Sequence, residues 1–217
     1  MNNTYNSYID REKSWLTFNA RVLQEANDAN VPLLDRFRFL GIFSNNLDEF
    51  FRVRYAAIRR MSLESAESEK ILGVKAEQLL KEITEIVIEQ QSESLRILNE
   101  IEKKLELENI FIINEKDISK EQEKFIHDYF IQKVSPALVT IMLNDLEEFP
   151  LLKDTSGYLA VKLVMNGSEI FNNKAKEIRY AVVEIPNTIN RFVVLPSNSE
   201  KQYIILLDDV IRYNLNN

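Results

Sequence analysis

Residues 45 to 60 hold most of the side chains whose type and spacing could serve chemistry. The polar and charged members of this segment are Asn45, Asn46, Asp48, Glu49, Arg52, Arg54, Arg59 and Arg60. A carboxamide offers a hydrogen-bond donor and an acceptor together, and a guanidinium group keeps its positive charge at neutral pH. Such groups suit the recognition of a nucleotide or a phosphate, so this segment is the first candidate for a binding site.

The adjacent carboxylates of Asp48 and Glu49 are a poor pair of metal ligands. Metal ligands must converge on one point, whereas neighbouring residues on a helix point about 100° apart. We expect both residues in the first turn of a helix, where their charge interacts favourably with the helix dipole. We therefore predict no metal site in this chain.

His127 is the single histidine of the sequence and is followed by Asp128. A histidine beside an acidic residue on an amphipathic helix is typical of the phosphoacceptors of two-component histidine kinases. A histidine phosphotransfer module centred on His127 is therefore one alternative function. We favour an ordinary surface or half-buried histidine, because His127 lies between Ile126 and Tyr129, which we expect to be core residues.

Two further kinds of site are excluded by composition. The chain contains no cysteine, which excludes disulfides, thiolate nucleophiles and zinc–thiolate sites. Its four glycines, at positions 41, 73, 157 and 167, are isolated. A Gly-rich phosphate-binding loop is therefore absent from the sequence.

The overall balance of residues is that of a globular protein with an excess of negative charge. Apolar residues make up 45% and charged residues 28%, and the formal net charge is −7. This charge argues against nucleic acid as a partner, because binding a phosphate backbone needs a positive field. We find neither a signal segment nor the roughly 18 consecutive apolar residues of a membrane span. We expect a cytoplasmic protein, and peripheral membrane association stays open.

The helical spacing of apolar residues predicts an all-α bundle over residues 1–107. The first helix is expected to have Ser14 as its N-cap. Its buried face is expected to carry Trp15, Phe18, Val22 and Ala26. A second helix starts at Pro32, the pair Asn45-Asn46 interrupts its apolar run, and helical spacing resumes up to Met61. Residues 62–70 predict a loop, and residues 74–107 predict one long amphipathic helix.

Residues 108–217 predict an α+β domain with an antiparallel sheet. Ser119 and Gln122 form a capping-box pattern that opens a helix. Beyond Gly157, apolar residues alternate with period two, and Asn166-Gly167 is a turn dipeptide. The expected strands are residues 109–113, 159–165, 178–185, 191–195 and 202–207. A last helix begins near residue 208, and we expect the natural polypeptide to continue beyond this domain.

Several blocks of the sequence resemble the first family of polyphosphate kinases. The sharpest blocks are residues 14–19 (SWLTFN), 21–26 (RVLQEA), 31–36 (VPLLDR), 38–40 (RFL) and 43–54 (FSNNLDEFFRVR). They stand in the order and at the spacing of that family. A looser likeness continues through residues 111–115, 158–161, 180–186 and 204–209, so that the resemblance covers nearly the whole chain.

The resemblance implies a four-domain enzyme that transfers the γ-phosphate of ATP reversibly to inorganic polyphosphate. The family uses a phosphohistidine intermediate and Mg²⁺. This chain would supply the helical N-terminal domain and part of the following head domain, whereas the catalytic histidine and the magnesium ligands would lie in two C-terminal domains. The expected partners are ATP, polyphosphate and further subunits of a homo-oligomer, and the chain alone is expected to be inactive. A helical interaction module without chemistry is the alternative from another class.

By the same resemblance, Asn46 contacts ATP, as the second asparagine of the SNNLDEF motif. The residue type also favours another role, in which Asn45 or Asn46 caps the helix that follows. Arg54 lies in the apolar stripe and inside the motif. We expect it to reach a buried carboxylate such as Asp48, or a neighbouring domain, and we treat Arg54 and Asp48 as supporting residues.

Arg52, Arg59 and Arg60 are predicted to lie within about one face of a helix. This face could attract polyphosphate. We favour the alternative, a solvated face whose arginines pair with Glu64 or Glu67.

Overall fold

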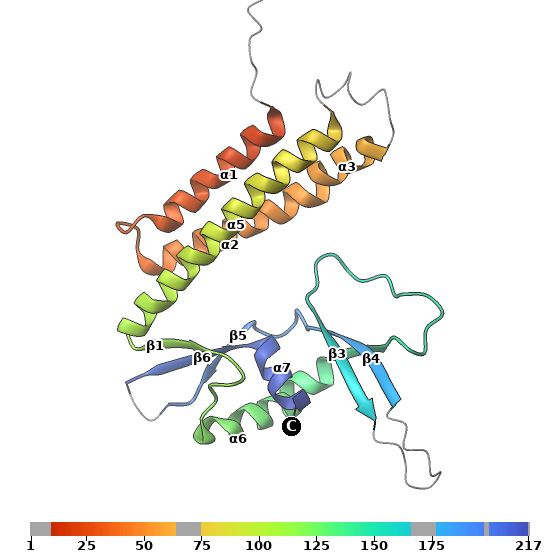
Figure 1. The fold of residues 1–217 in the computed structure, drawn as a ribbon. Coiled ribbons are helices and arrows are strands. Elements are labelled where there is room, and N and C mark those ends of the chain that lie inside the picture. Colours follow the sequence, from red (N-terminus) through yellow and green to blue (C-terminus); the bar gives the residue numbers. More distant parts are fainter. Residues whose placement is uncertain (1–9, 64–74, 166–176, 198–199, 217) are drawn as a thin grey trace, which may run out of the picture. The chain divides into compact units, whose positions relative to one another are not determined.

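The fold was obtained as a computed structural model, which describes residues 10–63, 75–165, 177–197 and 200–216. The chain divides into two compact units, Met1–Glu108 (unit 1) and Asn109–Asn217 (unit 2). Unit 1 is helical, and unit 2 combines helices with sheets (Figure 1). The predicted fold class, a helical bundle followed by an α+β part with antiparallel strands, is thereby confirmed.

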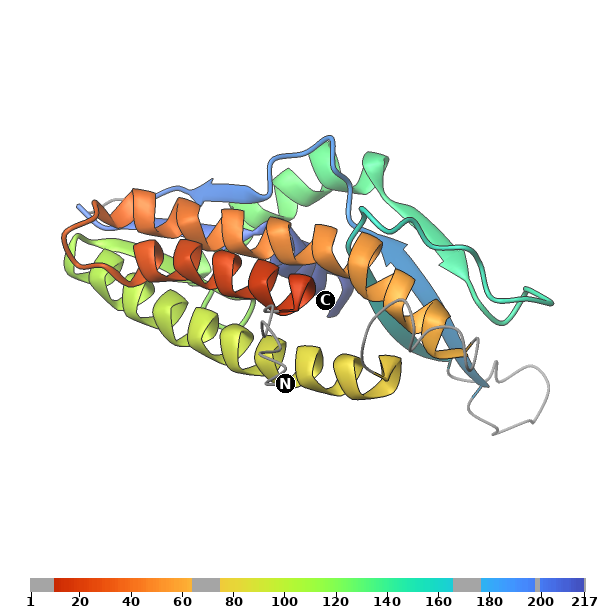
Figure 2. The same ribbon diagram turned by 90° about the horizontal axis from the view of Figure 1, so that it is seen from above.

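Unit 1 is built from the helices α1 (Arg11–Asn27), α2 (Leu33–Phe50), α3 (Ala56–Leu63) and α5 (Ala76–Leu107). Figure 2 shows α1, α2 and α5 running side by side. Their buried apolar side chains form the core: Leu16, Leu23, Ala26, Leu40, Phe43, Leu47, Phe50, Leu79, Ile83, Val87, Ile97, Ile101 and Leu105. Each helix alone would expose its apolar stripe to water, so the stripes hold the helices together.

Helix α1 begins earlier, and buries a different face, than the pattern predicted. Asp10 and not Ser14 is its N-cap, since the Asp10 carboxylate accepts from two backbone N–H groups of the first turn at 3.0 and 3.1 Å. The inner face includes Glu12 and Asn19, whereas Phe18 is 60% exposed. The predicted face was right for Ala26, which is buried, and wrong for Phe18. It counted apolar residues alone and so missed two inward-facing polar residues.

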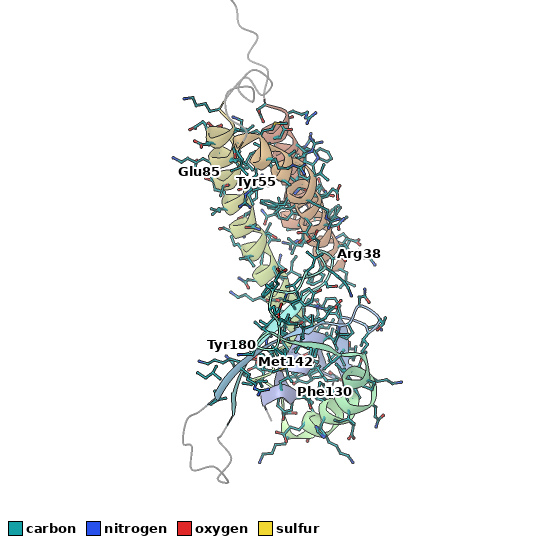
Figure 3. The ribbon with its side chains drawn as sticks, turned by 90° about the vertical axis from the view of Figure 1, so that its right-hand side faces the viewer. Arg38, Tyr55, Glu85, Phe130, Met142 and Tyr180 are labelled. Carbon is teal, nitrogen blue, oxygen red and sulfur yellow. The ribbon has the colours of Figure 1, made fainter. Side chains whose placement is uncertain are left out.

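Helix α2 continues through Asn45 and Asn46, so no new helix begins at this pair. Pro32 is the N-cap of α2 and precedes its first helical residue. A π-helical segment, Phe51–Tyr55, follows α2 and leads into α3. Figure 3 shows Tyr55 and Arg38 toward opposite ends of unit 1. The predicted loop at 62–70 was wrong for its first two residues, which are helical, and the rest lies outside the described residues.

Arg36 on α2 is the largest fully buried side chain of unit 1 and is 1% exposed. Its Nε donates to the carbonyl oxygen of Ala26 at 2.7 Å, and its Nη2 lies 3.2 Å from the Glu100 carboxylate. Hydrogen bonds from Lys104 and Arg36 lower the pKa of Glu100 to about 2. Arg36 therefore ties the end of α1 and the C-terminal part of α5 to α2.

The long helix predicted over residues 74–107 is confirmed as α5. It ends where Asn109 adopts a left-handed backbone conformation with φ 61°. Asparagine tolerates this conformation better than most residues, and it is a common end of helices. Within the described parts of the chain, no helix is both long and apolar enough to cross a membrane.

The described residues of unit 2 form two three-stranded sheets. The first has the order β1 (Ile110–Ile113), β6 (Gln202–Leu206), β5 (Phe192–Leu195), with β1 and β6 parallel. The second has the order β2 (Val139–Met142), β4 (Glu177–Glu184), β3 (Tyr158–Met165), and is antiparallel throughout. The prediction of one antiparallel sheet missed β2 and the parallel pair. The Asn166-Gly167 turn lies outside the described residues.

The helices of unit 2 pack on the first sheet. Helix α6 (Lys120–Tyr129) opens with the predicted capping box, in which the Ser119 N–H donates to Gln122 Oε1 at 3.1 Å. A π-helical segment, Phe130–Val134, follows it, and α7 (Leu207–Asn216) continues directly from β6. The core that they share consists of Ile126, Val134, Ile185, Val193, Leu195, Ile205, Leu207, Val210 and Ile211.

Candidate functional site

Asn46 takes part in an amide network between α1 and α2. Its Nδ2 donates to Oδ1 of Asn19 at 3.0 Å, and Nδ2 of Asn19 donates to the carbonyl oxygen of Phe43 at 3.2 Å. Asn19 is 0% exposed, whereas Asn46 is partly exposed. Because Asn46 lies inside α2 and bonds to another helix, the interpretation of Asn46 as a helix cap was wrong.

The carbonyl oxygen of Phe43 determines how both amides are oriented. A carbonyl only accepts hydrogen bonds, so Asn19 must turn its amino group toward Phe43. The side-chain oxygen of Asn19 then faces Asn46, which must donate to it from its own amino group. As a result, the carboxamide oxygen of Asn46 does not point at Asn19 and can accept from another group.

A cavity of about 390 Å³ lies between α1 and the end of α2. It is lined by Arg11, Glu12, Trp15, Glu49, Phe50, Val53, Arg54, Ala57, Ile58 and Met61. The rings of Trp15 and Phe50 stack with their centroids 5.0 Å apart. Phe50 is one helical turn along α2 from Asn46. The volume is at the low end of the range of about 300–1,000 Å³ that is usual for small-molecule sites.

Arg54 lies in the π-helical segment and faces α1 across this cavity. Its Nη1 is 3.7 Å from Glu12 Oε1, and its Cζ is 5.9 Å from the centroid of the Trp15 ring. Glu12 is 8% exposed and also accepts from Arg11 Nε and Nη2 at 3.1 and 3.0 Å. Arg54 therefore reaches a buried carboxylate, as expected, but that carboxylate is Glu12 and not Asp48. π-helical turns often occur at functional sites.

Asp48 and Glu49 lie in the last turn of α2, so their expected place in a first helical turn was wrong. Glu49 is 3.8 Å from Arg52, and both side chains are largely exposed. In the described part of the chain, no hydrogen bond or ion pair joins Asp48 to Asn46 or Arg54. The structure therefore brings Arg54, but not Asp48, toward the cavity.

Arg59 and Arg60 are exposed on α3. Their expected partners Glu64 and Glu67 lie outside the described residues, so the pairing remains a prediction. On α6, His127 is exposed, and its Nδ1 is 3.1 Å from the amide oxygen of Asn214. Among the residues that the structure describes, no group of three or more histidine or acidic side chains could hold a metal ion.

A charged cluster at the start of α7 was not predicted from the sequence. Asp208 contacts Arg191 at 3.1 Å and Arg212 at 3.2 Å, and Asp209 forms a close ion pair with Arg212. Glu115 is 3.9 Å from the same Arg212. Burial, with the negative charge of Asp208 as the next contribution, raises the pKa of Asp209 to about 6, while Arg212 opposes this shift.

Sequence reasoning missed Asn19 and Glu12, the two residues that hold Asn46 and Arg54. A usable signal existed in the spacing of residues 12, 16, 19, 23 and 26, which fits one face of a helix with three apolar members. Polar residues on such a face are buried only when they are paired. Their presence on a core face is therefore an indicator of a polar network.

Two family models match the chain, one for each unit. Residues 8–113 match the polyphosphate kinase N-terminal domain, and residues 121–217 match the polyphosphate kinase middle domain. Together they span both units of the structure. The chain therefore belongs to the polyphosphate kinase family.

Individual relatives agree with this assignment. Polyphosphate kinase of Vibrio parahaemolyticus is 38% identical over 212 residues, which are 96% of this chain and 29% of that protein. Polyphosphate kinase of Escherichia coli K12 is 39% identical over 214 residues, with the same two shares. The crystal structure of polyphosphate kinase from Porphyromonas gingivalis matches with a TM-score of 0.74 and 28% identity, over 95% of this chain and 30% of that one. The chain thus spans less than a third of the length of these relatives.

Proposed function

We propose that this chain forms the N-terminal and middle domains of an ATP:polyphosphate phosphotransferase, and that unit 1 contributes one wall of its ATP site through Asn46. The reaction is the reversible transfer of the ATP γ-phosphate to inorganic polyphosphate. Membership of the polyphosphate kinase family supports these substrates. The phosphohistidine and the transfer chemistry are assigned to parts of the enzyme beyond this chain, so the 217-residue chain by itself makes no polyphosphate.

The observation that carries the proposal is the held carboxamide of Asn46. Asn19 fixes its amino group at 3.0 Å, and the side chain remains partly exposed, one helical turn along α2 from Phe50, which lines the cavity. A hydrogen-bonding group that is already oriented loses little conformational entropy when a ligand binds. Arg54, with 30% of its side chain exposed, brings a positive charge to the cavity that it lines. An oriented amide and a guanidinium group are both groups that recognise a nucleotide carrying phosphates.

Magnesium is assigned no ligand among the described residues, since none of their acidic groups converge on a metal site. In the proposed enzyme, Mg²⁺ would be held by ATP phosphates and by residues beyond this chain. Its chemistry there would be to offset the negative charge of the transferring phosphate. This chain's own share is to orient the nucleotide.

Contacts between subunits are a second part of the proposal. Phe18 and Leu34 are 60% and 64% exposed on the outer faces of α1 and α2. Large exposed apolar side chains are common in protein–protein interfaces. Light scattering of the wild-type chain and of the double variant Phe18→Ser/Leu34→Ser tests this part. A mass that stays that of a monomer for the wild type at all concentrations would contradict a contact made by this chain alone.

The ATP contact is tested by titrating the ¹⁵N-labelled chain with ATP and following the backbone and side-chain resonances of Asn46. We expect saturable shifts around Asn46 and Arg54. Asn46→Ala should raise the dissociation constant for ATP about threefold to tenfold, since a lost hydrogen bond costs about 0.5–1.5 kcal/mol. The matched control is Asn45→Ala, which removes an exposed amide from the neighbouring position. Equal affinities for wild type, Asn46→Ala and Asn45→Ala would refute the assignment.

Asn46→Ala also breaks the bond to Asn19, so folding must be separated from binding. Thermal unfolding followed by circular dichroism gives the stability of each variant. Titrations are then carried out well below the lower melting temperature, where both proteins are folded. A binding defect that persists under these conditions cannot be a consequence of unfolding.

A further inference from the structure

Asn19 is an unusual residue for the place that it occupies. It is 0% exposed and lies on the same face of α1 as Leu16 and Leu23, which are core residues. Burying an amide in such surroundings is costly unless its polar atoms are paired. The Asn19 Nδ2 and Oδ1 atoms do find partners, and both partners belong to α2. A leucine at this position would fill a similar volume without any polar atom to satisfy.

The two bonds of Asn19 differ in what they contribute. The carbonyl of Phe43 belongs to the continuous helix α2, so the bond from Asn19 is an addition to the helical pattern. The other bond is donated to Asn19 by Asn46, whose partly exposed side chain is the candidate ligand contact. The chain of donors and acceptors runs in one direction only, from Asn46 through Asn19 to the Phe43 carbonyl. This direction prevents the Asn46 amide from turning over by 180°.

We propose that Asn19 is a positioning residue that makes Asn46 selective for adenine. With its amino group held by Asn19, Asn46 presents its carboxamide oxygen as a fixed acceptor, beside the second hydrogen of Nδ2. An acceptor next to a donor complements the 6-amino group and the neighbouring ring nitrogen of adenine. Guanine and hypoxanthine carry a 6-oxo group at the same position, which is itself an acceptor and is repelled. The inference rests on the proposed function, because it specifies what the Asn46 contact recognises.

Replacing Asn19 should therefore reduce the preference for adenine over 6-oxo bases without abolishing nucleotide binding. Without the anchor, the amide of Asn46 can turn over and offer its amino group to a 6-oxo base. A purely structural role of Asn19 predicts something different, namely equal changes for adenine and hypoxanthine nucleotides. The ratio of the two affinities is thus the quantity that separates positioning from stability.

The experiment titrates the ¹⁵N-labelled 217-residue chain with ATP and, separately, with ITP, which differs from ATP only at position 6 of the base and the adjacent ring nitrogen. The wild type is expected to bind ATP about tenfold more tightly than ITP. Asn19→Leu is expected to bring this ratio to within about twofold of one, mainly by weakening ATP. Circular dichroism establishes that the variant is folded. If Asn19→Leu does not fold, Asn19→Ala removes the same two bonds and keeps a residue that favours helix.

Each outcome decides the question. An ATP:ITP ratio that is unchanged in the folded Asn19 variant overturns the inference, as does a wild-type ratio near one. If ATP binds and Asn46→Ala weakens it while the ratio is insensitive to Asn19, the proposed function survives and only this inference fails. If neither nucleotide shifts the Asn46 resonances of the wild type, the proposed function fails and this inference fails with it.

Discussion

The carboxyl group of Asp209 should make unit 2 less stable as the pH rises from 4 to 6. Its pKa is raised from 3.8 to about 6 in the folded state, with burial as the main cause. Between these two values the folded chain binds a proton that the unfolded chain has released. Stability therefore falls as the pH rises through this window, and it levels off above pH 6. The groups that face Asp209 are Asp208 and Arg212 on α7 and Glu115 after β1.

The magnitude follows from the difference between the two pKa values. Each pH unit corresponds to about 1.4 kcal/mol, so ionising Asp209 costs up to about 3 kcal/mol. Its side chain is 9% exposed, so water screens this cost only weakly. The carboxamide introduced by Asp209→Asn stays neutral at all pH values and can still donate to Glu115, as the protonated carboxyl does. We therefore expect Asp209→Asn to raise the free energy of unfolding by about 1–3 kcal/mol at pH 7.5 and to change it little at pH 4.

Urea unfolding at a series of pH values from 4 to 8, followed by circular dichroism, measures this difference. The variant minus wild-type free energy should grow with pH up to about 6 and then stay constant. Asp128→Asn, which removes an exposed carboxylate from the same unit, is the matched control and should change stability by less than about 0.5 kcal/mol at every pH. A difference that is constant across the series, or that shrinks as the pH rises, would refute the reasoning.

Three further predictions concern unit 1. Arg36→Met should lower the free energy of unfolding by about 2–3 kcal/mol, because it removes a charged donor that is 1% exposed, and urea unfolding measures this. Asp10→Ala should lower it by about 1 kcal/mol and Ser14→Ala should leave it nearly unchanged, because Asp10 is the cap of α1; equal effects in thermal melts would contradict the assignment. Residues 1–108 alone should give a helical circular dichroism spectrum and a cooperative melt, and a disordered spectrum would mean that the helices need unit 2 or another subunit.

Much of the fold follows from local patterns in the sequence. The apolar spacing of residues 74–107 predicted α5, and the pair Ser119 and Gln122 predicted the start of α6. Both features depend on residues within one or two helical turns of each other. Strand pairing is different in kind. The partner of β1 is β6, which lies far along the chain, and no local pattern distinguishes a parallel from an antiparallel partner for so short a strand.

The errors within unit 1 have a common physical origin. Asn45 or Asn46 was considered as the cap of a helix that follows, because asparagine side chains often bond to the backbone at helix ends. In the structure the Asn46 side chain is bonded to Asn19 on another helix, so it does not compete with the backbone of α2. Phe18 was expected to be buried because it is apolar, yet that would have required Asn19 to face outward. Each local rule failed because a tertiary hydrogen bond outweighed it.

The wrong expectations for α1 and for α2 both involve the pair Asn19 and Asn46. A core built for stability alone would have an apolar residue at position 19 and a better helix former at position 46. The chain instead places two amides where α1 crosses α2 and orients them with a backbone carbonyl. Departures from local consistency are expected where a protein must present chemistry to a ligand. The positions at which pattern reasoning failed in α1 and α2 therefore support, independently of any resemblance, the proposal that Asn46 contacts a ligand and that Asn19 orients it.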